Sequence, residues 1–482
     1  MVRYGLQDVP AERDLFEITG YINGLQDFIL ECSTPMTISI QGDWGTGKTS
    51  IMNHVAQGIR EAAGSRDDIL TVNFNTWQFS QFNLGDQLPI IFMRKLISEV
   101  STPESAFKSM AESCLTELLS FGVKKVTGGA LDSKTFMEKD VLTTIEKLKD
   151  TFQGLVTERA TKDRKEDGRV IIFVDDLDRL NPGRAVELLE VLKLFLDCER
   201  CVFVLAIDYN VVVSGVKEKY GQDFKEEKGR QFFDKIIQVP FKMPIASYNV
   251  EHYIAECFKQ IGVKDVSDED LVKYRNLIGA SIGNNPRAMK RLFNSFMLLR
   301  KITTEKSLLE GENRILLFAV LCMQSRYERA YNHMISLRSS SADVMEFIQS
   351  ARDAESPFYK DEADEAVVKQ TCAFMGEFFD IIDKDGSGSF DEEEERSFMR
   401  VLDFSTVTSA GPEVSSLSED KQLMLDYMNG FIEKAKESVL FSERFEGIGE
   451  RKATMSNMLS FASSRPGISF RYQILRGQAA YE

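Results

Sequence analysis

Nine residues near the N-terminus, GDWGTGKTS, combine residue types that bind phosphate. Glycines allow the backbone to approach a ligand at positions where a Cβ would block it. A lysine followed by a threonine supplies a cation for the β- and γ-phosphates and a hydroxyl for Mg²⁺. A turn that merely caps a helix would not explain this pair. We therefore predict a nucleotide-binding loop formed by Gly42, Asp43, Trp44, Gly45, Thr46, Gly47, Lys48, Thr49 and Ser50.

Three carboxylates follow a second apolar run, VIIFVDDLDRL, at Asp175, Asp176 and Asp178. Hydrolysis of a phosphoanhydride needs an acidic metal site and a group that orients the attacking water. We assign Asp175 to Mg²⁺ and Asp176 to the role of general base, and the reverse assignment stays open. The alternative is a solvated acidic turn. Carboxylates at the end of a buried strand favour the ligand site, because open α/β sheets bind ligands at that edge.

The elements that would position these residues are also visible in the pattern. A β-branched run at 37–41 leads into Gly42, and apolar residues at helical spacing follow Lys48. Phosphate fits between such a strand and helix, because backbone N–H groups and the helix N-terminus converge there. Further strands are predicted at 169–174, at 201–208 and within 229–244. Trp77, just after the strand LTVNF, is expected to pack in the core.

Length and charge limit the other classes of function. A chain of 482 residues predicts two to four domains, and the net charge of −16 disfavours a general electrostatic grip on nucleic acid. Seven scattered cysteines and three separated histidines do not form a zinc site or a histidine-based site. No signal-peptide pattern and no apolar run of membrane length occurs, so we expect a cytoplasmic protein without a membrane span.

Several blocks together resemble the KAP family of P-loop NTPases. The matching blocks, in order over roughly residues 10–300, are GDWGTGKTS, FNTWQFS, VIIFVDDLDRL, CVFVLAIDYNVV, DKIIQVPFKMP and GNNPRAMKRLFN. The resemblance implies an α/β fold with a parallel five-strand core sheet flanked by helices, a helical lid and a mostly α-helical C-terminal region. It implies ATP with Mg²⁺ as the ligands, since no guanine-reading tetrad is present.

The resemblance also implies roles for single residues. Asp208 would be the polar sensor at the tip of its strand, and Arg287 would be the lid arginine that reaches the γ-phosphate. A surface charge at the start of a helix is the alternative for Arg287. Arg230 is similar in placement to the arginine that related ATPases insert into the site of a neighbour.

The insert at about 80–165 departs from family members that carry membrane helices there, because it is polar and amphipathic. We predict a soluble helical subdomain for it. The domains are then an NTPase core at 1–245, a helical lid at 246–310, a helical domain at 311–435 and a basic, aromatic tail at 436–482. The tail favours a contact within the chain or with a protein; a nucleic-acid contact is the less favoured alternative.

A second constellation, DKDGSGSFDEEE at 383–394, resembles an EF-hand calcium loop. Its ligand positions would be filled by Asp383, Asp385, Ser387, Ser389, Asp391 and Glu394, with a turn glycine at position six. The alternative is an acidic turn between two helices with chance spacing, since no second loop accompanies it. Without a cation, mutual repulsion should raise the pKa values of these carboxyls.

These patterns together favour an ATPase that acts as a nucleotide-dependent switch or assembly ATPase, in signalling or antiviral defence. It would act through a protein partner or self-assembly. Two other functions stay open. One is a scaffold that binds ATP without hydrolysing it, and the other is an ATPase that nucleic acid stimulates.

Overall fold

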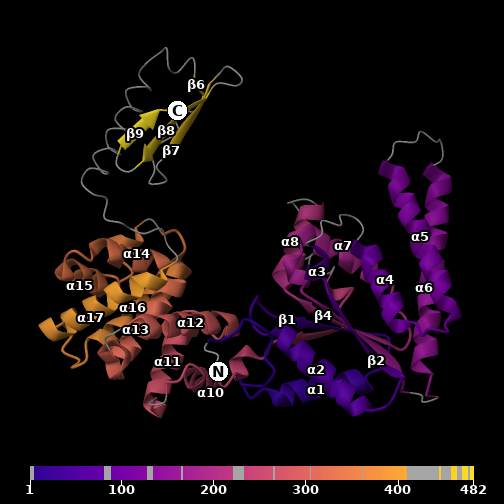
Figure 1. Cartoon of the computed structure of the whole chain (residues 1–482), viewed down its shortest axis with the longest axis horizontal. Coiled ribbons are helices and arrows are strands. Elements are labelled where there is room, and N and C mark those ends of the chain that lie inside the picture. Colours follow the sequence, from indigo (N-terminus) through magenta and orange to yellow (C-terminus); the bar gives the residue numbers. More distant parts are fainter. Residues whose placement is uncertain are drawn as a thin grey trace. The chain divides into compact units, whose positions relative to one another are not determined.

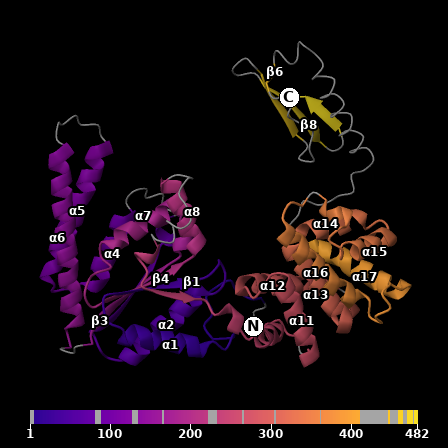
Figure 2. The same cartoon turned by 180° about the vertical axis from the view of Figure 1, so that it is seen from behind.

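The computed structural model describes residues 5–80, 88–126, 134–163, 167–220, 233–263, 266–303, 306–360 and 362–409, and four short strands between 445 and 481. The chain divides into two compact units, Met1–Ser325 and Arg326–Glu482, which we describe separately (Figure 1; Figure 2 gives the reverse view). Arg230 and the side chains of the predicted tail lie outside the described residues.

The first unit is built on a parallel sheet of five strands in the order β2-β3-β4-β1-β5. This confirms the predicted fold class. β3 and β4 are almost continuously apolar, because both of their faces are covered. Pro240 lies in the edge strand β5, where a missing N–H costs little. The strand bounds are β1 (Met36–Gln41), β2 (Ile69–Asn75), β3 (Arg169–Asp175), β4 (Cys201–Ile207) and β5 (Val239–Lys242).

Helices cover both faces of this sheet (Figure 1). Alternate residues of β3 divide between the two faces: Val170, Ile172 and Val174 join the buried cluster that includes α4, α6 and α7. α1 and α2 lie on the opposite face (Figure 1). The helices here are α1 (Thr19–Glu31), α2 (Lys48–Ala63), α4 (Leu88–Val100), α6 (Lys134–Ala160), α7 (Pro182–Lys193) and α8 (Tyr209–Tyr220).

The insert is helical, as the sequence predicts, with α3 (Trp77–Ser80), α4, α5 (Ala106–Val126) and α6. α5 and α6 form a long antiparallel pair that projects from the sheet (Figure 1). Among the described residues, no helix combines the length and apolar character that a bilayer span requires.

The lid consists of α10 (Val250–Gln260), α11 (Asp268–Ala280) and α12 (Pro286–Ile302). Its core is aromatic: Phe258 contacts the rings of Tyr274, Phe293 and Phe318. Phe318 belongs to α13 (Gly311–Arg326), which lies beyond the predicted lid boundary at 310. The first unit therefore extends through α13 to Ser325.

The second unit contains α14 (Glu328–Leu337), α15 (Ser341–Ser350), α16 (Glu365–Ile382) and α17 (Glu392–Ser405). Its buried residues include Phe374, Phe378 and Phe398, and the Tyr331 and Ser405 hydroxyls share a hydrogen bond of 3.0 Å. Four antiparallel strands follow, β6 (Phe445–Glu446), β7 (Met458–Ser463), β8 (Ser469–Leu475) and β9 (Gln478–Tyr481). No strands are predicted for this segment from its sequence pattern.

Short 3₁₀ helices complete both units. They are η2 (Leu177–Arg179), η3 (Ile245–Ser247), η4 (Lys306–Leu309), η5 (Pro357–Tyr359) and η6 (Thr406–Thr408).

Candidate functional site

The phosphate-binding loop lies between β1 and α2, as predicted. Gly45 and Gly47 have φ values of 85° and 101°, a region that favours glycine. The Thr46 hydroxyl donates to the Asp43 carbonyl at 2.7 Å, and the buried Tyr248 hydroxyl donates to the Thr46 carbonyl at 2.8 Å. The conformation of the loop is thus stabilised by a hydrogen bond within the loop and by a second one from Tyr248, which follows η3.

Lys48 is the first residue of α2, and its ammonium faces three acceptors of the chain. Nζ lies 2.8 Å from the Gly42 carbonyl oxygen, 3.2 Å from the Asp43 carbonyl oxygen and 2.7 Å from Oδ2 of Asp178. The side chains of Lys48 and Asp178 are only 7% and 6% exposed. Asp178, which the sequence analysis gives no role, is therefore the carboxylate nearest to the phosphate-binding lysine.

Asp175 ends β3, and the Thr49 hydroxyl at the start of α2 lies near its carboxylate. Burial, followed by the charge of Asp176, raises the pKa of the Asp175 carboxyl. Two oxygen atoms that can bind a metal thus lie near each other, one at the end of β3 and one at the start of α2. Mg²⁺ takes carboxylate, hydroxyl and water oxygens in such sites, so this pair fits the ion.

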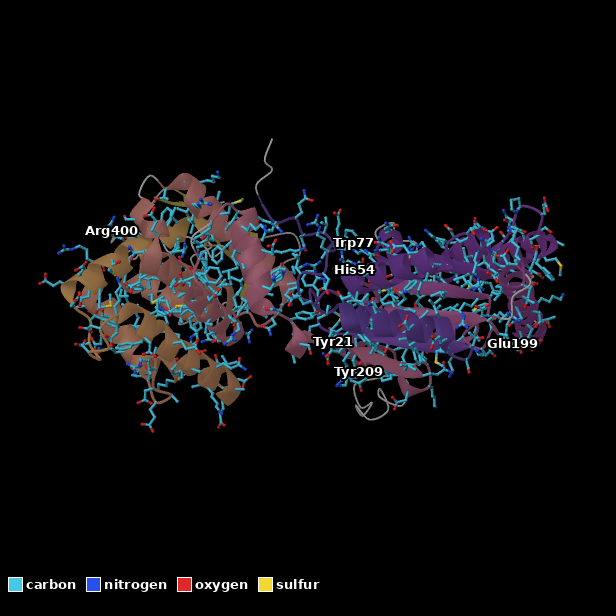
Figure 3. All side chains as sticks on the ribbon, turned by 90° about the horizontal axis from the view of Figure 1, so that it is seen from below. Tyr21, His54, Trp77, Glu199, Tyr209 and Arg400 are labelled. Carbon is cyan, nitrogen blue, oxygen red and sulfur yellow. The ribbon has the colours of Figure 1, made fainter. Side chains whose placement is uncertain are left out.

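Asp176 has a left-handed backbone, with φ of 59°. Its carboxylate accepts from the Asn75 amide at 2.7 Å and pairs with Nε of Arg179 at 2.7 Å. The Arg179 guanidinium lies over the ring of Trp77 at 5.0 Å. The expectation that Trp77 packs in the core is wrong, since its side chain is exposed and lies at the surface (Figure 3).

The lid reaches the loop through the start of α12. The Asn285 side chain accepts from the Arg287 and Ala288 N–H groups and so caps the helix, while its amide donates to the Trp44 carbonyl at 2.9 Å. Nε of Arg287 pairs with Oδ1 of Asp8 at 2.9 Å, and its guanidinium lies 4.7 Å from the Trp44 ring centroid. Nη1 of Arg287 is buried and has no hydrogen-bond partner among the described residues.

The N-terminal segment crosses from the lid to α2. The backbone of Leu6 exchanges two hydrogen bonds with the Asn294 side chain, at 2.7 and 2.8 Å. Lys290 donates to the Val9 carbonyl, and the Ala11 N–H donates to the Ser50 hydroxyl. We call residues 6–11 the N-terminal strap.

A cavity of about 300 Å³ joins these parts. Polar, charged and aromatic side chains from the loop, the strap, β2, β3 and α12 converge on it. The lining residues are Asp8, Val9, Pro10, Trp44, Gly45, Gly47, Lys48, Thr49, Ser50, Asn75, Trp77, Gln78, Asp175, Asp176, Asp178, Arg179, Pro286, Arg287 and Lys290.

Most residues of the predicted nucleotide site line this cavity. Gly42, Asp43, Thr46 and Asp208 are not among its lining residues. Asp208 directly follows the end of β4. Its carboxylate accepts from the Asn210 N–H at 2.9 Å at the start of α8, so its sensor role stays a prediction. Asp8, Asn75 and Arg179 are lining residues that the sequence analysis missed. Arg179 stands in the DDLDR block, and Asn75 directly follows the predicted strand LTVNF, so both carried a signal, whereas Asp8 carried none.

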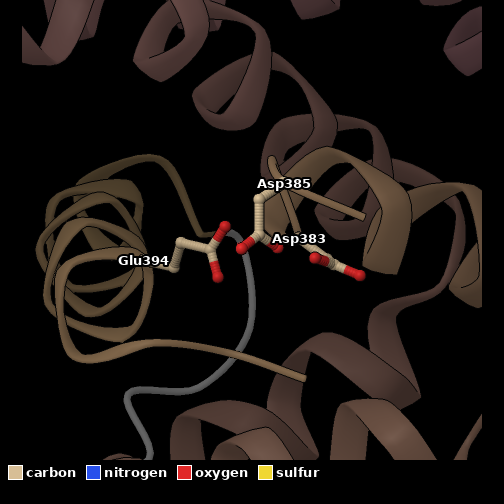
Figure 4. A group of neighbouring side chains, drawn as sticks. All are labelled: Asp383, Asp385 and Glu394. Atoms are coloured by element: carbon tan, nitrogen blue, oxygen red, sulfur yellow. The ribbon is translucent and has the colours of Figure 1, made fainter. Parts of the chain in front are cut away.

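The calcium-like loop lies in the second unit, between α16 and α17. One oxygen from each of Asp383, Asp385 and Glu394 lies within 4.8 Å of the others (Figure 4). Gly388, at position six, has φ of 80°, and the Asp391 carboxylate caps α17.

Most of the loop carboxylates bind the backbone of their own loop. Asp383 accepts from the Ser387 and Gly388 N–H groups, and Glu394 accepts from the Lys384 N–H at 2.6 Å. The Ser387 hydroxyl donates to the Ser389 carbonyl. The prediction of raised pKa values is wrong for Asp385, because the hydrogen bond from the Ser387 N–H lowers the pKa of its carboxyl.

A phosphate-binding loop and a strand-end carboxylate pair, on a five-strand parallel sheet, define a P-loop NTPase. The model of the "KAP family P-loop domain" matches residues 18–303, more than half of the chain, and the chain belongs to this family. Membership supports nucleotide binding and the use of Mg²⁺ that is usual in this class.

Two individual similarities accompany this match. The Phage T7 exclusion protein of Escherichia coli strain K12 is 22% identical over 324 residues, which cover 61% of this chain and 42% of that protein. The chain therefore spans less than half the length of this relative. The "Structure of Drosophila ORC bound to GC-rich DNA and Cdc6" shows 11% identity, with 88% of this chain and 67% of that chain covered. The TM-score of this match is 0.29.

Proposed function

We propose that the chain binds ATP at residues 42–50 and hydrolyses it at the end of β3. The observation that carries this proposal is the convergence of Lys48, Thr49, Asp175 and Arg287 on one cavity next to the loop. Backbone N–H groups at the start of α2 would hold the phosphates, since a helix N-terminus attracts anions.

Asp175 and Thr49 would hold Mg²⁺, which supplies charge neutralisation on the phosphate oxygens when bound. Asp176 would accept the proton of the attacking water. The hydrogen bond from Asn75 and the ion pair with Arg179 fix the direction of its carboxylate, and release of one of them would free an oxygen for that proton. Arg287 would contact the γ-phosphate from the lid, and its buried, unbonded Nη1 supports this role.

Phosphate release by the parent, Asp176→Asn and Asp175→Asn tests these roles. Asn keeps the shape of Asp but cannot accept the proton, so Asp176→Asn should retain Mg²⁺–ATP binding and lose turnover. Asp175→Asn should weaken binding with Mg²⁺ more than binding in EDTA. Tight ATP binding without phosphate release by the parent would support the non-hydrolytic scaffold instead.

The output of the cycle, in our proposal, is a change in self-assembly or in contact with a protein partner. ATP-dependent size, measured by light scattering with the Lys48→Ala variant as control, tests this. The name of the relative from Escherichia coli leads us to propose a role in phage exclusion. Reduced T7 plaque formation in cells that express the parent, but not Lys48→Ala, would support it. Turnover that rises on addition of DNA or RNA would instead favour the nucleic-acid-stimulated ATPase.

We propose a second function for the loop at 383–394, the binding of Ca²⁺. The observation that favours it is the approach of three carboxylate oxygens from Asp383, Asp385 and Glu394. Glu394 would be the bidentate ligand, a geometry that Ca²⁺ accepts and Mg²⁺ does not.

Calorimetric titration of the whole chain with Ca²⁺ decides this. Glu394→Gln should abolish the heat, while Glu393→Gln removes the same charge from an exposed neighbour and should leave it in place. Equal heats in the two variants, or none in the parent at millimolar Ca²⁺, would leave an acidic helix–turn–helix.

A further inference from the structure

The ammonium of Lys48 is surrounded by acceptors of the chain in this structure. Nζ donates hydrogen bonds to the Gly42 and Asp43 carbonyls, and it forms an ion pair of 2.7 Å with Oδ2 of Asp178, which has no hydrogen-bond partner among the described residues. A phosphate that approaches Lys48 therefore meets a cation whose charge the chain already compensates.

Asp178 is the acceptor that conflicts with phosphate. The two carbonyls are neutral and belong to the loop itself, whereas Asp178 is charged and its side chain is nearly buried. A phosphate on the same ammonium would place two anions side by side where little water screens them, and such like charges repel strongly. Exchange of Asp178 for phosphate avoids that repulsion, but it separates a buried ion pair, which is costly.

We propose that Asp178 is an affinity-determining residue of the nucleotide site, a carboxylate of the chain that competes with phosphate for Lys48. This inference rests on the proposed binding of nucleotide at residues 42–50 and goes beyond it. Asp178 keeps the buried lysine charge compensated and positioned, and by the same contact it weakens nucleotide binding.

A second pair of lining residues has the same charge pattern. Arg287, the lid cation, pairs with Asp8 of the N-terminal strap. The Asp8 side chain is 59% exposed, so water screens this pair and its effect on affinity should be much smaller. The two pairs thus give an expected order, with Asp178 the strong competitor and Asp8 the weak one.

Calorimetric titration with ATP and with ADP tests the proposal, in Mg²⁺ and in EDTA. Asp178→Asn keeps the shape and removes the charge, so it should tighten Kd for both nucleotides about tenfold, in both buffers. Asp8→Asn should tighten it no more than about threefold, and Asp27→Asn, an exposed acid on α1, serves as the control for net charge. Without nucleotide, Asp178→Asn should melt at a lower temperature, because Lys48 loses its partner.

A double-mutant cycle shows whether the effect passes through Lys48. In a Lys48→Ala background, measured at millimolar nucleotide, Asp178→Asn should improve affinity by less than it does in the parent, because only the direct repulsion of phosphate is left to relieve. Should Asp178→Asn not fold, Asp178→Ser offers Lys48 a neutral acceptor and carries the same expectation.

An unchanged or weaker affinity of Asp178→Asn overturns the proposal. Weakening confined to Mg²⁺ would show that Asp178 serves the metal site instead. If the parent binds no nucleotide, the proposed function fails and this inference fails with it. If the parent binds but Asp178→Asn does not bind more tightly, the inference alone fails.

Discussion

Gly45→Ala should destabilise the contact between the phosphate-binding loop and the lid. Gly45 has φ of 85°, and a Cβ there would lie 2.9 Å from Cβ of Arg287 and 2.7 Å from Oδ1 of Asn285. The Asn285 amide can rotate, but Cβ of Arg287 is fixed to the backbone of α12. The helix start must therefore shift, or the loop must.

The expected cost has two parts. A non-glycine residue at this positive φ costs about 1–2 kcal/mol. Displacement of Asn285 disrupts its cap on α12, which costs about 1 kcal/mol, and breaks its hydrogen bond to Trp44, another ~1 kcal/mol. The sum is about 3–4 kcal/mol, which corresponds to a Tm decrease of about 4–6 °C in a unit of this size.

Thermal melting of the parent, Gly45→Ala and Gly24→Ala measures this. Gly24 lies inside α1, and a methyl group added there would have no neighbouring atom within 4 Å, so alanine should be neutral or stabilise by about 0.5–1 kcal/mol. If the crowding of α12 is the cause, Asn285→Ala should cost less in the Gly45→Ala background than alone. A Gly45→Ala chain as stable as the parent would refute the reasoning.

Three further outcomes are expected. Lys48→Ala should lose the ATP-induced stabilisation of about 2.7 kcal/mol that the parent shows at an ATP concentration of one hundred times Kd. Without ATP, the variant should also melt at a lower temperature, because the buried carboxylate of Asp178 loses its partner. Equal thermal shifts by ATP in variant and parent would contradict this. Tyr248→Phe leaves the Thr46 carbonyl without its donor and should cost about 1–2 kcal/mol in urea unfolding; no change in midpoint would contradict it. Burial, and then the charge of Arg329, lowers the pKa of His333, so stability from this group is present above about pH 6.5 and declines as pH falls through the folded-state pKa. His333→Gln should flatten the pH dependence of melting between pH 7.5 and 5, and an unaltered slope would exclude this origin.

The sequence predicted the parts of the site that follow from local pattern. The pattern of a strand, a glycine-rich loop and a helix predicted the positions of Lys48 and Thr49. The apolar run 169–174 predicted that Asp175 lies at the end of a strand, at the edge of the sheet. These predictions depend only on residues that are neighbours in the sequence, and the structure confirms the parallel sheet.

The ion pairs of the site could not be predicted from the sequence. Asp8 meets Arg287 only because the N-terminal strap runs between α12 and α2, and no periodicity encodes that path. Asp176 points to Asn75 because its own backbone is left-handed, while Asp178, two residues on, takes the position beside Lys48. Three aspartates in one short segment thus acquire different partners through backbone turns that residue type alone does not fix.

The placement of the two tryptophans has an optical consequence. Trp44 and Trp77 are the only tryptophans in the sequence, and both line the cavity, each beneath an arginine. All indole emission of the chain therefore originates at the mouth of one site, and the second unit contributes none. Ligand arrival or arginine movement should change the intensity or wavelength of that emission in the unlabelled protein. Far-ultraviolet circular dichroism follows both units, so a mismatch between the two signals on heating would separate the melting of one unit from that of the other.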